Sequence, residues 1–344
     1  MLCRCYYLSI VLSASGFRSA QEGSLSCLYG APDSPEKAKN NTARRDVMGS
    51  SMKKIGMMGL ALLASAMFVA AAHAEIKVGI LALRGAPKVM EEWAATGEYL
   101  TGKMGEPVTI MPLEFNAIEP MLRDGKIDFM LANSAFFVEM EKLYGAKPVA
   151  MQVNSAGGKP VKEFGGVIFV RKDSPINTLS DLKGKKFMVV KASSFGGGQM
   201  ALRLLLQNGI DYKKDFAEFK EGGKHDNVVL AVKNGAMDAG TVRTDTLEAM
   251  TKEGKISMAD FKIINPIKDG FPFVRSTELY PEWPMAAAKH VDAAKVKKFG
   301  DALLAVKSDS DAAKKAGIIG WAPPADFKSV RECLKALKYG AFAN

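Results

Sequence analysis

The sequence predicts an α/β protein with two lobes and a ligand cleft between them. From Glu75 onward, short apolar runs rich in β-branched residues alternate with amphipathic helical patterns, which is typical of mostly parallel sheets flanked by helices. The alternation occurs in two successive series, and a further helical stretch follows them. The length beyond Glu75 is sufficient for two hydrophobic cores or for one large domain. We expect a ligand where strands end and helices begin.

A secretory signal peptide is predicted at residues 52–74. Two lysines precede an apolar run that ends in the small-x-small pattern Ala72-His73-Ala74, as in cleavable signals. Residues 1–51 are then expected to be an upstream extension, with the true start at Met48 or Met52. An uncleaved membrane anchor is the alternative, because the run is about long enough to span a bilayer. Its alanine and glycine content favours cleavage, and we expect a soluble periplasmic product.

The predicted strands are short runs in which apolar and β-branched residues dominate. In chain order they are Ile76–Leu83, Val108–Leu113, Asp128–Ala132, Lys147–Val153, Gly166–Arg171, Lys186–Val190, Ala217–Lys220, Asp238–Val242, Phe261–Pro266 and Phe271–Val274. The predicted helices are segments whose apolar residues recur every three or four positions. In chain order they are Lys88–Lys103, Asn116–Arg123, Ser134–Leu143, a single turn in Asn177–Gly184, Gly196–Leu206, His225–Lys233 and Thr244–Lys252. The last part is expected to be helical, since the same spacings recur in Val296–Val306 and Phe327–Leu337.

Composition and charge exclude several classes of site. The 344 residues carry a formal net charge of +10. Such a positive excess favours the capture of small anions by electrostatic steering, or it reflects lysine and arginine side chains on a solvated surface. Basic and aromatic residues do not cluster, so no nucleic acid is expected. Cys333 is the only cysteine beyond the leader and cannot form an internal disulfide or a multi-thiolate metal site. With His225 and His290 the only histidines there, we expect neither a metal nor another cofactor.

Four motifs occur in the order seen in phosphonate-type periplasmic solute-binding proteins. They are Leu179-x-Asp-Leu-Lys-Gly-Lys-Lys186, the loop around Ser194, Gly223-x-His225-Asp226, and Ala231-Val-x-Asn-Gly-x-x-Asp-Ala-Gly240. The chain resembles this family over nearly all of residues 75–344. The resemblance implies a type II periplasmic binding protein fold, with two mixed sheets flanked by helices and a central ligand cleft.

Further motifs are more similar to the phosphonate-binding-protein-like sensor domains of bacterial histidine kinases, including tetrathionate sensors. They are Ser194-Phe-Gly-Gly197, Gly240-Thr-Val-Arg-Thr-Asp-Thr-Leu-Glu248, Ser276-Thr-x-Leu-Tyr-Pro-Glu-Trp-Pro284 and Gly320-Trp-x-x-Pro324. In phosphonate binders the first motif is Ser-Thr-Ser-Gly, so this chain lacks two hydroxyl donors there and has an aromatic ring. The ligand therefore stays open between phosphonate-like or phosphate-like anions and sulfur oxyanions.

The two-lobed arrangement implied by the resemblance also gives expected boundaries. Lobe one is expected at residues 75–165 plus 265–344, and lobe two at 166–264. The two segments that connect the lobes are then expected near Gly165–Arg171 and Lys262–Pro266.

Candidate ligand contacts lie at the ends of the predicted strands and in the motifs above. They are Arg84, Phe115, Asn116, Asn133, Ser134, Ser193, Ser194, Phe195, Gly196, Gly197, His225, Arg243, Thr244 and Glu282. Unpaired amides at the helix start near Ser194 are expected to hold an oxyanion, because backbone donors and the helix dipole both favour an anion there. The Arg243 guanidinium would grip it through parallel N–H groups.

These candidates also have structural interpretations. Ser194 can act as an ordinary helix cap, Arg243 can pair with Asp245, and His225 can face solvent at the start of its helix. The aromatic segment around Trp283 can form one wall of the pocket or plug the space between the lobes.

The expected function is capture of a small oxyanion and its delivery to an ABC-type permease by a monomeric, exported protein. The alternative is a stand-alone sensing subunit for a separate membrane histidine kinase. An enzyme on this fold is a weaker alternative, because His225 and Asp226 are merely adjacent and no nucleophile accompanies them. No catalytic residue is therefore assigned.

Overall fold

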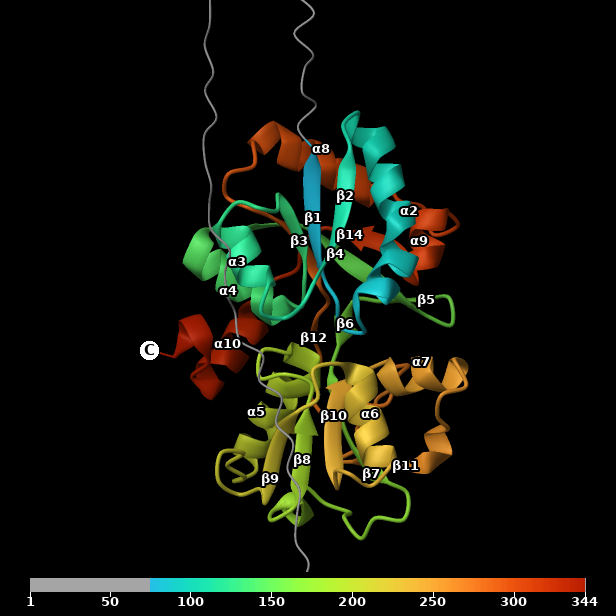
Figure 1. Cartoon of the computed structure of the whole chain (residues 1–344), viewed down its shortest axis with the longest axis vertical. Coiled ribbons are helices and arrows are strands. Elements are labelled where there is room, and N and C mark those ends of the chain that lie inside the picture. Colours follow the sequence, from blue (N-terminus) through green and yellow to red (C-terminus); the bar gives the residue numbers. More distant parts are fainter. Residues whose placement is uncertain (1–74, 344) are drawn as a thin grey trace, which may run out of the picture. The chain divides into compact units, whose positions relative to one another are not determined.

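The computed structural model describes residues 75–343 of the chain. Its strands form two large sheets and one two-stranded sheet, and Figure 1 shows the large sheets in two lobes joined by the small one. The predicted signal peptide and upstream extension lie outside the described residues. None of the helices in the described range combines the length and the apolar character that crossing a membrane requires.

Lobe one is built on a seven-stranded sheet of order β14-β4-β13-β3-β1-β2, with β5 paired to β4. Its strands are β1 (Ile76–Leu81), β2 (Val108–Leu113), β3 (Phe129–Leu131), β4 (Lys147–Ala156), β5 (Lys159–Val161), β13 (Pro284–Ala287) and β14 (Ile318–Ala322). β1 pairs in parallel with β2 and β3, whereas β13, β4, β14 and β5 pair with their neighbours antiparallel. The sheet is therefore mixed rather than mostly parallel.

Helices cover both faces of this sheet, with α2, α8 and α9 packed together on one face and α3 and α4 on the other (Figure 1). The helices of this lobe are α2 (Ala86–Met104), α3 (Ile118–Arg123), α4 (Ser134–Tyr144), α8 (Ala293–Leu304) and α9 (Asp311–Ala316), and α10 (Lys328–Leu337) packs both on α4 and on lobe two. The local sequence explains the bounds of α2, because Pro87 lies in its first turn and Gly105 ends it in a left-handed conformation. Val89, Trp93 and Leu100 form its buried stripe.

Lobe two has a five-stranded sheet of order β11-β7-β10-β8-β9. Its strands are β7 (Gly166–Arg171), β8 (Lys186–Val189), β9 (Glu218–Glu221), β10 (Ala239–Arg243) and β11 (Phe261–Ile264). Its helices are α5 (Met200–Gln207), α6 (His225–Lys233) and α7 (Thr246–Lys252), and a π-helical turn, Phe195–Gln199, precedes α5. β10 pairs in parallel with β8 and antiparallel with β7, so this sheet is mixed too.

Two strands connect the lobes and pair with each other antiparallel: β6 (Glu163–Phe164) and β12 (Tyr280–Pro281). The stretch 265–277 lies between β11 and β12. Within it, the backbone N–H of Ser276 donates to the carbonyl of Gly166, and its hydroxyl accepts from the N–H of Ile168. These bonds tie the stretch to β7 of lobe two. We therefore propose that the second boundary follows residue 277 rather than residue 264.

Several predicted elements differ from the structure. The segment Phe271–Val274 forms no strand, and the C-terminal part contains β13 and β14 in addition to its helices. β13 begins with a proline and continues Met-Ala-Ala, so it lacks the β-branched residues by which strands are recognised. Gly320 interrupts the apolar run of β14. Both strands form because they pair with neighbouring strands and are buried in the sheet. This is a tertiary effect that β-propensity does not capture.

Candidate functional site

A constriction divides the space between the lobes. On one side lies a cavity of about 450 Å³, here called the Arg243 cavity. On the other side lies a groove of about 700 Å³, here called the Glu139 groove. The constriction itself has a volume of about 10 Å³ and is lined by Phe115, His225, Arg243 and Trp283, among others. A space of this size holds about one water molecule, so a larger ligand does not fit in the constriction.

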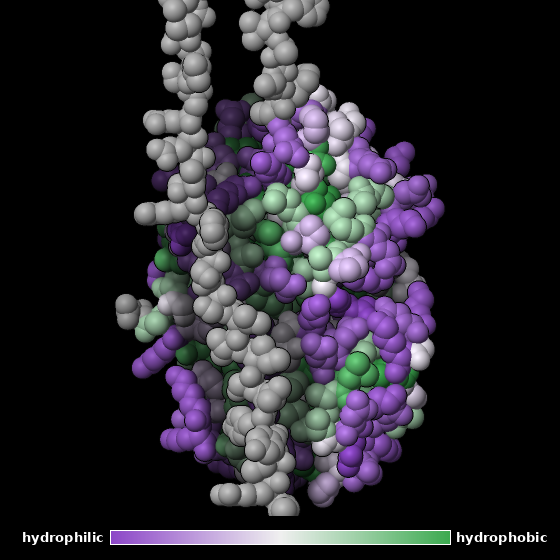
Figure 2. All heavy atoms as spheres, in the orientation of Figure 1, coloured by the Kyte–Doolittle hydropathy of each residue, from purple (hydrophilic) through white to green (hydrophobic). Residues whose placement is uncertain are grey.

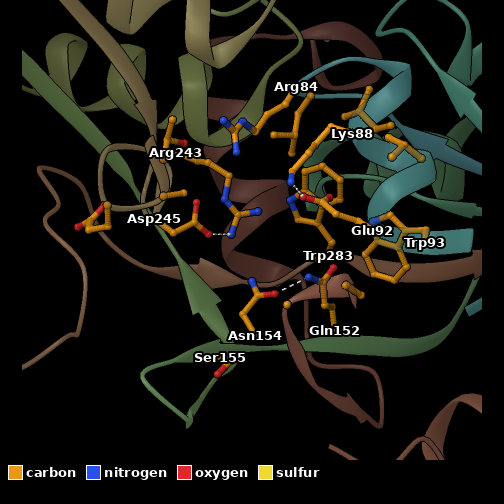
Figure 3. Close-up of a pocket in the computed structure, with 18 of the residues that line it drawn as sticks. Arg84, Lys88, Glu92, Trp93, Gln152, Asn154, Ser155, Arg243, Asp245 and Trp283 are labelled. Carbon is orange, nitrogen blue, oxygen red and sulfur yellow. Dashed lines mark hydrogen bonds and ion pairs between the residues drawn. The ribbon is translucent and has the colours of Figure 1, made fainter. Parts of the chain in front are cut away.

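Both lobes line the Arg243 cavity, and Figure 3 shows their side chains converging on it. Its polar and aromatic lining residues are Arg84, Lys88, Glu92, Trp93, Gln152, Asn154, Ser155, Arg243, Asp245, Thr246, Glu248, Lys252, Phe273 and Trp283. Lobe one supplies residues from the end of β1, from α2 and from β4, while lobe two supplies the end of β10 and the start of α7. The mixed polar and aromatic lining is typical of small-molecule sites of this volume.

Arg243 ends β10 and is buried between the lobes. Its Nη2 atom lies 2.8 Å from Glu282 Oε1 and 3.1 Å from Asp245 Oδ2. The guanidinium carbon lies 4.7 Å from the centroid of the Phe164 ring. Pairing with Asp245 is thus present, and Glu282 adds a second carboxylate. Among the residues that the structure describes, Nη1 has no hydrogen-bond partner, and it belongs to a residue that lines the cavity.

Glu282 is almost completely buried and accepts three hydrogen bonds. The donors are Arg243 Nη2, Asn154 Nδ2 at 2.6 Å and the backbone N–H of Trp283 at 3.2 Å. Burial raises the pKa of Glu282, and the charge of Arg243 opposes this rise. Because the side chain is enclosed by the protein's own donors, it fixes Arg243 in place and does not face an open space.

Two buried polar atoms that belong to cavity-lining residues lack a partner. They are Nε1 of Trp283 and Oε2 of Glu248. A buried N–H group without an acceptor costs free energy, so such groups in native structures call for an explanation. Trp283 Nε1 and Arg243 Nη1, which belong to two residues of the cavity lining, are thus donors without a partner among the described residues.

The lining of the cavity carries both acidic and basic side chains. Burial raises the pKa of Glu92 to about 7 and also raises the pKa of Asp245 and of Glu248. At neutral pH the carboxyl group of Glu92 is therefore only partly ionised. Within residues 75–343, no group of three or more His, Cys, Asp or Glu side chains is placed to hold a metal ion.

The loop Ser194–Gly198 is packed against the protein's own residues. A Cβ atom on Gly196 would lie 2.7 Å from Cβ of Arg243, and one on Gly197 would lie 2.5 Å from Cγ2 of Val190. One on Gly198 would lie 2.6 Å from the carbonyl oxygen of Lys191. The three glycines are therefore explained by close internal packing. The Ser194 side chain caps no backbone N–H here, so the structural alternative for this serine is not realised.

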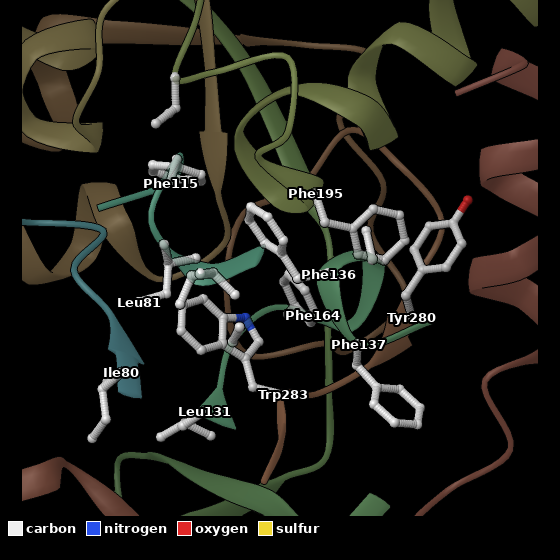
Figure 4. Close-up of a cluster of buried hydrophobic side chains, with 14 of the residues drawn as sticks. Ile80, Leu81, Phe115, Leu131, Phe136, Phe137, Phe164, Phe195, Tyr280 and Trp283 are labelled. Carbon is white, nitrogen blue, oxygen red and sulfur yellow. The ribbon is translucent and has the colours of Figure 1, made fainter. Parts of the chain in front are cut away.

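Phe195 joins an aromatic cluster beside the segments that connect the lobes (Figure 4). Its ring centroid lies 5.9 Å from that of Phe164 and 4.8 Å from that of Tyr280, both in edge-on arrangements. All three side chains are buried. The aromatic ring in this loop, in place of a hydroxyl, thus stabilises the connection between the lobes.

His225 is buried at the start of α6 and does not face solvent. Its Nδ1 accepts a hydrogen bond from the backbone N–H of Arg243 at 3.4 Å. Burial, with Arg243 nearby, lowers the pKa of His225 to about 3, so the ring is neutral at physiological pH. With Nδ1 as the acceptor, the proton resides on Nε2, and the ring lines the constriction as a donor.

Arg84 is fully engaged with two carboxylates of lobe two. Its Nε and Nη2 atoms donate to Asp226 at 2.8 and 3.0 Å, and Nη1 and Nη2 donate to Glu253 at 2.7 Å each. Figure 2 shows hydrophilic residues gathered on this face where the start of α2 approaches α6 and α7. Arg84 thus clamps the lobes together at the edge of the Arg243 cavity.

The other predicted residues have structural roles or lie elsewhere. Asn133 caps α4 through two backbone N–H groups, and the Ser134 hydroxyl donates to the carbonyl of Pro281. Thr244 exchanges hydrogen bonds with Gly165 beside the first connecting segment. The remaining residues line the Glu139 groove: Phe115, Asn116 and Ser193. The structure therefore divides most of the predicted set between the cavity, the constriction and the groove. The residues that line none of the three are Ser134, Gly197, Thr244 and Glu282.

Sequence reasoning missed Gln152 and Asn154, which line the cavity from β4. The two amides are hydrogen-bonded to each other, and Asn154 also donates to Glu282. The sequence does contain a pattern that indicates them, because two amide residues two positions apart on an apolar strand lie on the same face of the sheet. Asp245 was recognised only as a partner of Arg243 and not as part of the site.

Comparison with known proteins agrees with this architecture. The solved structure of PhnD1 from Prochlorococcus marinus in complex with methylphosphonate is 18% identical, with a TM-score of 0.64, and the match covers 76% of this chain and 98% of that one. XAC2383 from Xanthomonas citri, solved with ATP, is 22% identical with a TM-score of 0.61, covering 77% and 97%. At these identities the likeness shows the fold, which is the predicted type II periplasmic binding protein fold.

Curated relatives include a sensor and a transport protein. Tetrathionate sensor histidine kinase TtrS of Salmonella typhimurium is 29% identical over 263 residues, or 76% of this chain and 43% of that protein. The phosphonates-binding periplasmic protein of Escherichia coli is 26% identical over 221 residues, or 59% of this chain and 62% of that protein. The chain thus spans less than two thirds of either relative. Residues 78–327 match the family model described as ABC transporter, phosphonate, periplasmic substrate-binding protein, and the chain belongs to that family.

Proposed function

We propose that the protein captures a small oxyanion in the Arg243 cavity and delivers it to an ABC-type permease. The buried guanidinium of Arg243 carries this proposal, because its Nη1 atom has no partner among the described residues. The indole N–H of Trp283 supplies a second unpaired donor from the same cavity lining. Two unpaired donors in one cavity lining suit an anion's oxygen atoms. In this proposal the exported protein acts in the periplasm as a monomer, without a cofactor and without catalysis.

The loop Ser194–Gly198 has an indirect role in the proposed capture. Its glycines pack against Arg243 and His225 at the constriction, where there is room for about one water molecule. The loop therefore packs against the Cα and Cβ atoms of Arg243, and the oxyanion binds on the cavity side. Closure of the lobes would enclose the ligand, with the clamp from Arg84 to Asp226 and Glu253 stabilising the closed form.

A thermal-shift screen of the mature protein tests the capture of an oxyanion. The probes are phosphate, methylphosphonate, sulfate, thiosulfate and tetrathionate. An anion that binds the folded form raises the melting temperature in proportion to the logarithm of its concentration above the dissociation constant. The proposal is contradicted if no member of this panel raises the melting temperature, or if the protein converts a bound anion into another product.

Trp283→Phe is expected to weaken anion binding roughly tenfold to a hundredfold, the loss typical of one hydrogen bond to a charged group. The variant keeps an aromatic ring and removes an N–H that has no partner within the described residues, so its folding should change little. Trp321→Phe is the matched control. Its Nε1 is also buried and unpaired, but Trp321 is not among the cavity-lining residues. Calorimetric titration with the best anion of the screen should show weaker binding only for the Trp283 variant, and equal affinities would refute the donor role of Trp283.

A stand-alone sensing subunit is the second candidate, favoured by the likeness to the tetrathionate sensor kinase. The same capture step would then regulate a separate membrane kinase instead of a permease. Reconstitution separates the two roles. The loaded protein should stimulate ATP hydrolysis by a permease encoded beside it in the transport role, and should change the autophosphorylation of a kinase encoded there in the sensing role.

A further inference from the structure

The charge balance around Arg243 leaves no positive charge for an incoming anion. One guanidinium nitrogen, Nη2, faces both Asp245 and Glu282. If both carboxylates are ionised, this group of three side chains already carries a net negative charge. Adding an oxyanion would place a third negative charge beside one cation in a poorly solvated site, which is strongly unfavourable.

The surrounding groups do not supply the missing charge. Arg84 is engaged by its own two carboxylates, Asp226 and Glu253. From α2, Lys88 lies 3.7 Å from Glu92. From α7, Glu248 and Lys252 line the same cavity with opposite charges. His225, behind Arg243 on α6, is neutral because its pKa is lowered to about 3. Every cation that faces the site therefore has a carboxyl group near it or opposite it.

We infer that capture of an oxyanion at Arg243 is accompanied by the uptake of one proton, which Asp245 holds. This inference rests on the proposed function, since it describes how the same site accepts its ligand. Protonation removes one negative charge from the cluster and turns Asp245 from an acceptor into a hydroxyl donor. The protonated carboxyl can then donate a hydrogen bond to the bound anion, or to a water molecule that contacts the anion.

The geometry assigns the proton to Asp245 rather than to Glu282. Glu282 accepts hydrogen bonds from Arg243, Asn154 and the backbone of Trp283, and such donors stabilise the charged form. Asp245 has a single charged partner, Arg243, and 35% of its side chain is exposed, so it lines the cavity where a ligand would arrive. Burial raises the pKa of Asp245, and the charge of Arg243 lowers it. A bound anion partly neutralises the charge of Arg243, so anion binding raises the pKa of Asp245 further.

Calorimetric titration tests the inference with sulfate and tetrathionate, which keep their charge between about pH 5.5 and pH 8. Titrations at one pH in two buffers of different ionisation enthalpy give the number of protons taken up. We expect uptake approaching one proton per anion, and an affinity that rises toward tenfold for each pH unit of acidification within that range. Asp245→Asn should bind the anions at neutral pH with little uptake and a nearly flat pH dependence.

Glu248→Gln is the matched control, because Glu248 lines the same cavity but is not paired with Arg243. This variant should keep the proton uptake of the unmodified protein. Binding without uptake, or uptake that persists in Asp245→Asn or disappears in Glu248→Gln, would overturn the inference while leaving oxyanion capture in place. Absence of binding at every pH for the whole panel would contradict the proposed function itself.

Discussion

Arg243→Met is expected to lower the free energy of unfolding by about 3–5 kcal/mol at about pH 8, because it leaves buried carboxylates without their cation. Glu282 would lose its charged partner while remaining almost completely enclosed. Removing the cation also raises the pKa values of Asp245 and Glu282, since Arg243 lowers both. The folded variant then binds protons that the unfolded chain does not, so the loss of stability should become smaller as the pH falls toward 5.

Glu282→Gln is the matched comparison for this prediction. Arg243 keeps Asp245 as a partner in that variant, and the single amide oxygen of glutamine can still accept hydrogen bonds from Arg243 and Asn154, as Oε1 of Glu282 does. The bond from the backbone N–H of Trp283 to Oε2 is lost. We expect a loss of about 1–3 kcal/mol, the usual cost of one buried donor left without its acceptor. Urea unfolding followed by circular dichroism measures both variants. Equal losses, or a cost for Arg243→Met that does not depend on pH, would contradict the structural role given to the guanidinium.

Gly197→Ala should destabilise the protein by about 1–3 kcal/mol, the usual cost of overpacking a well-packed site. The added Cβ atom would lie 2.5 Å from Cγ2 of Val190 and 2.9 Å from Cε1 of His225. The control is Gly102→Ala, inside α2, where an added Cβ atom meets nothing within 4 Å. Alanine there should stabilise the helix by about 0.5–1 kcal/mol.

The same unfolding measurement separates the two interpretations of the glycine loop. If the glycines serve only to let a ligand approach, Gly197→Ala should unfold like the unmodified protein and lose affinity alone. Unchanged stability would therefore argue for a ligand contact at this loop and against the packing that the structure shows.

Much of the fold was predictable because the apolar periodicity is strong. The predicted bounds of the strand Gly166–Arg171 and of the helix His225–Lys233 are those of β7 and α6. The strand is a continuous apolar run, whereas the helix has its buried residues at helical spacing. β13 could not be recognised in the same way, since Pro-Met-Ala-Ala has no strand pattern and is held in the sheet by pairing with β3 and β4.

The position of several candidate residues between the lobes was predictable, but their contacts were not. The rule that ligands bind at the ends of strands indicated Arg84, His225 and Arg243, which all lie between the lobes. It could not show that Arg84 pairs with Asp226, which is 142 positions away in the sequence. The same limit applies to Glu282, whose partner Arg243 lies 39 positions away on the other lobe. Such pairs depend on how the lobes close on each other, which local patterns do not record.

The most direct measurement of the central claim is the position of a bound anion. A crystal structure of the mature protein with the strongest binder of the panel should place its oxygen atoms within hydrogen-bond distance of Arg243 Nη1 and Trp283 Nε1. The lobes should be closed over it, with the Arg84 clamp formed. An anion bound in the Glu139 groove, or on the backbone amides of Ser194–Gly198 without contact to Arg243, would contradict the account.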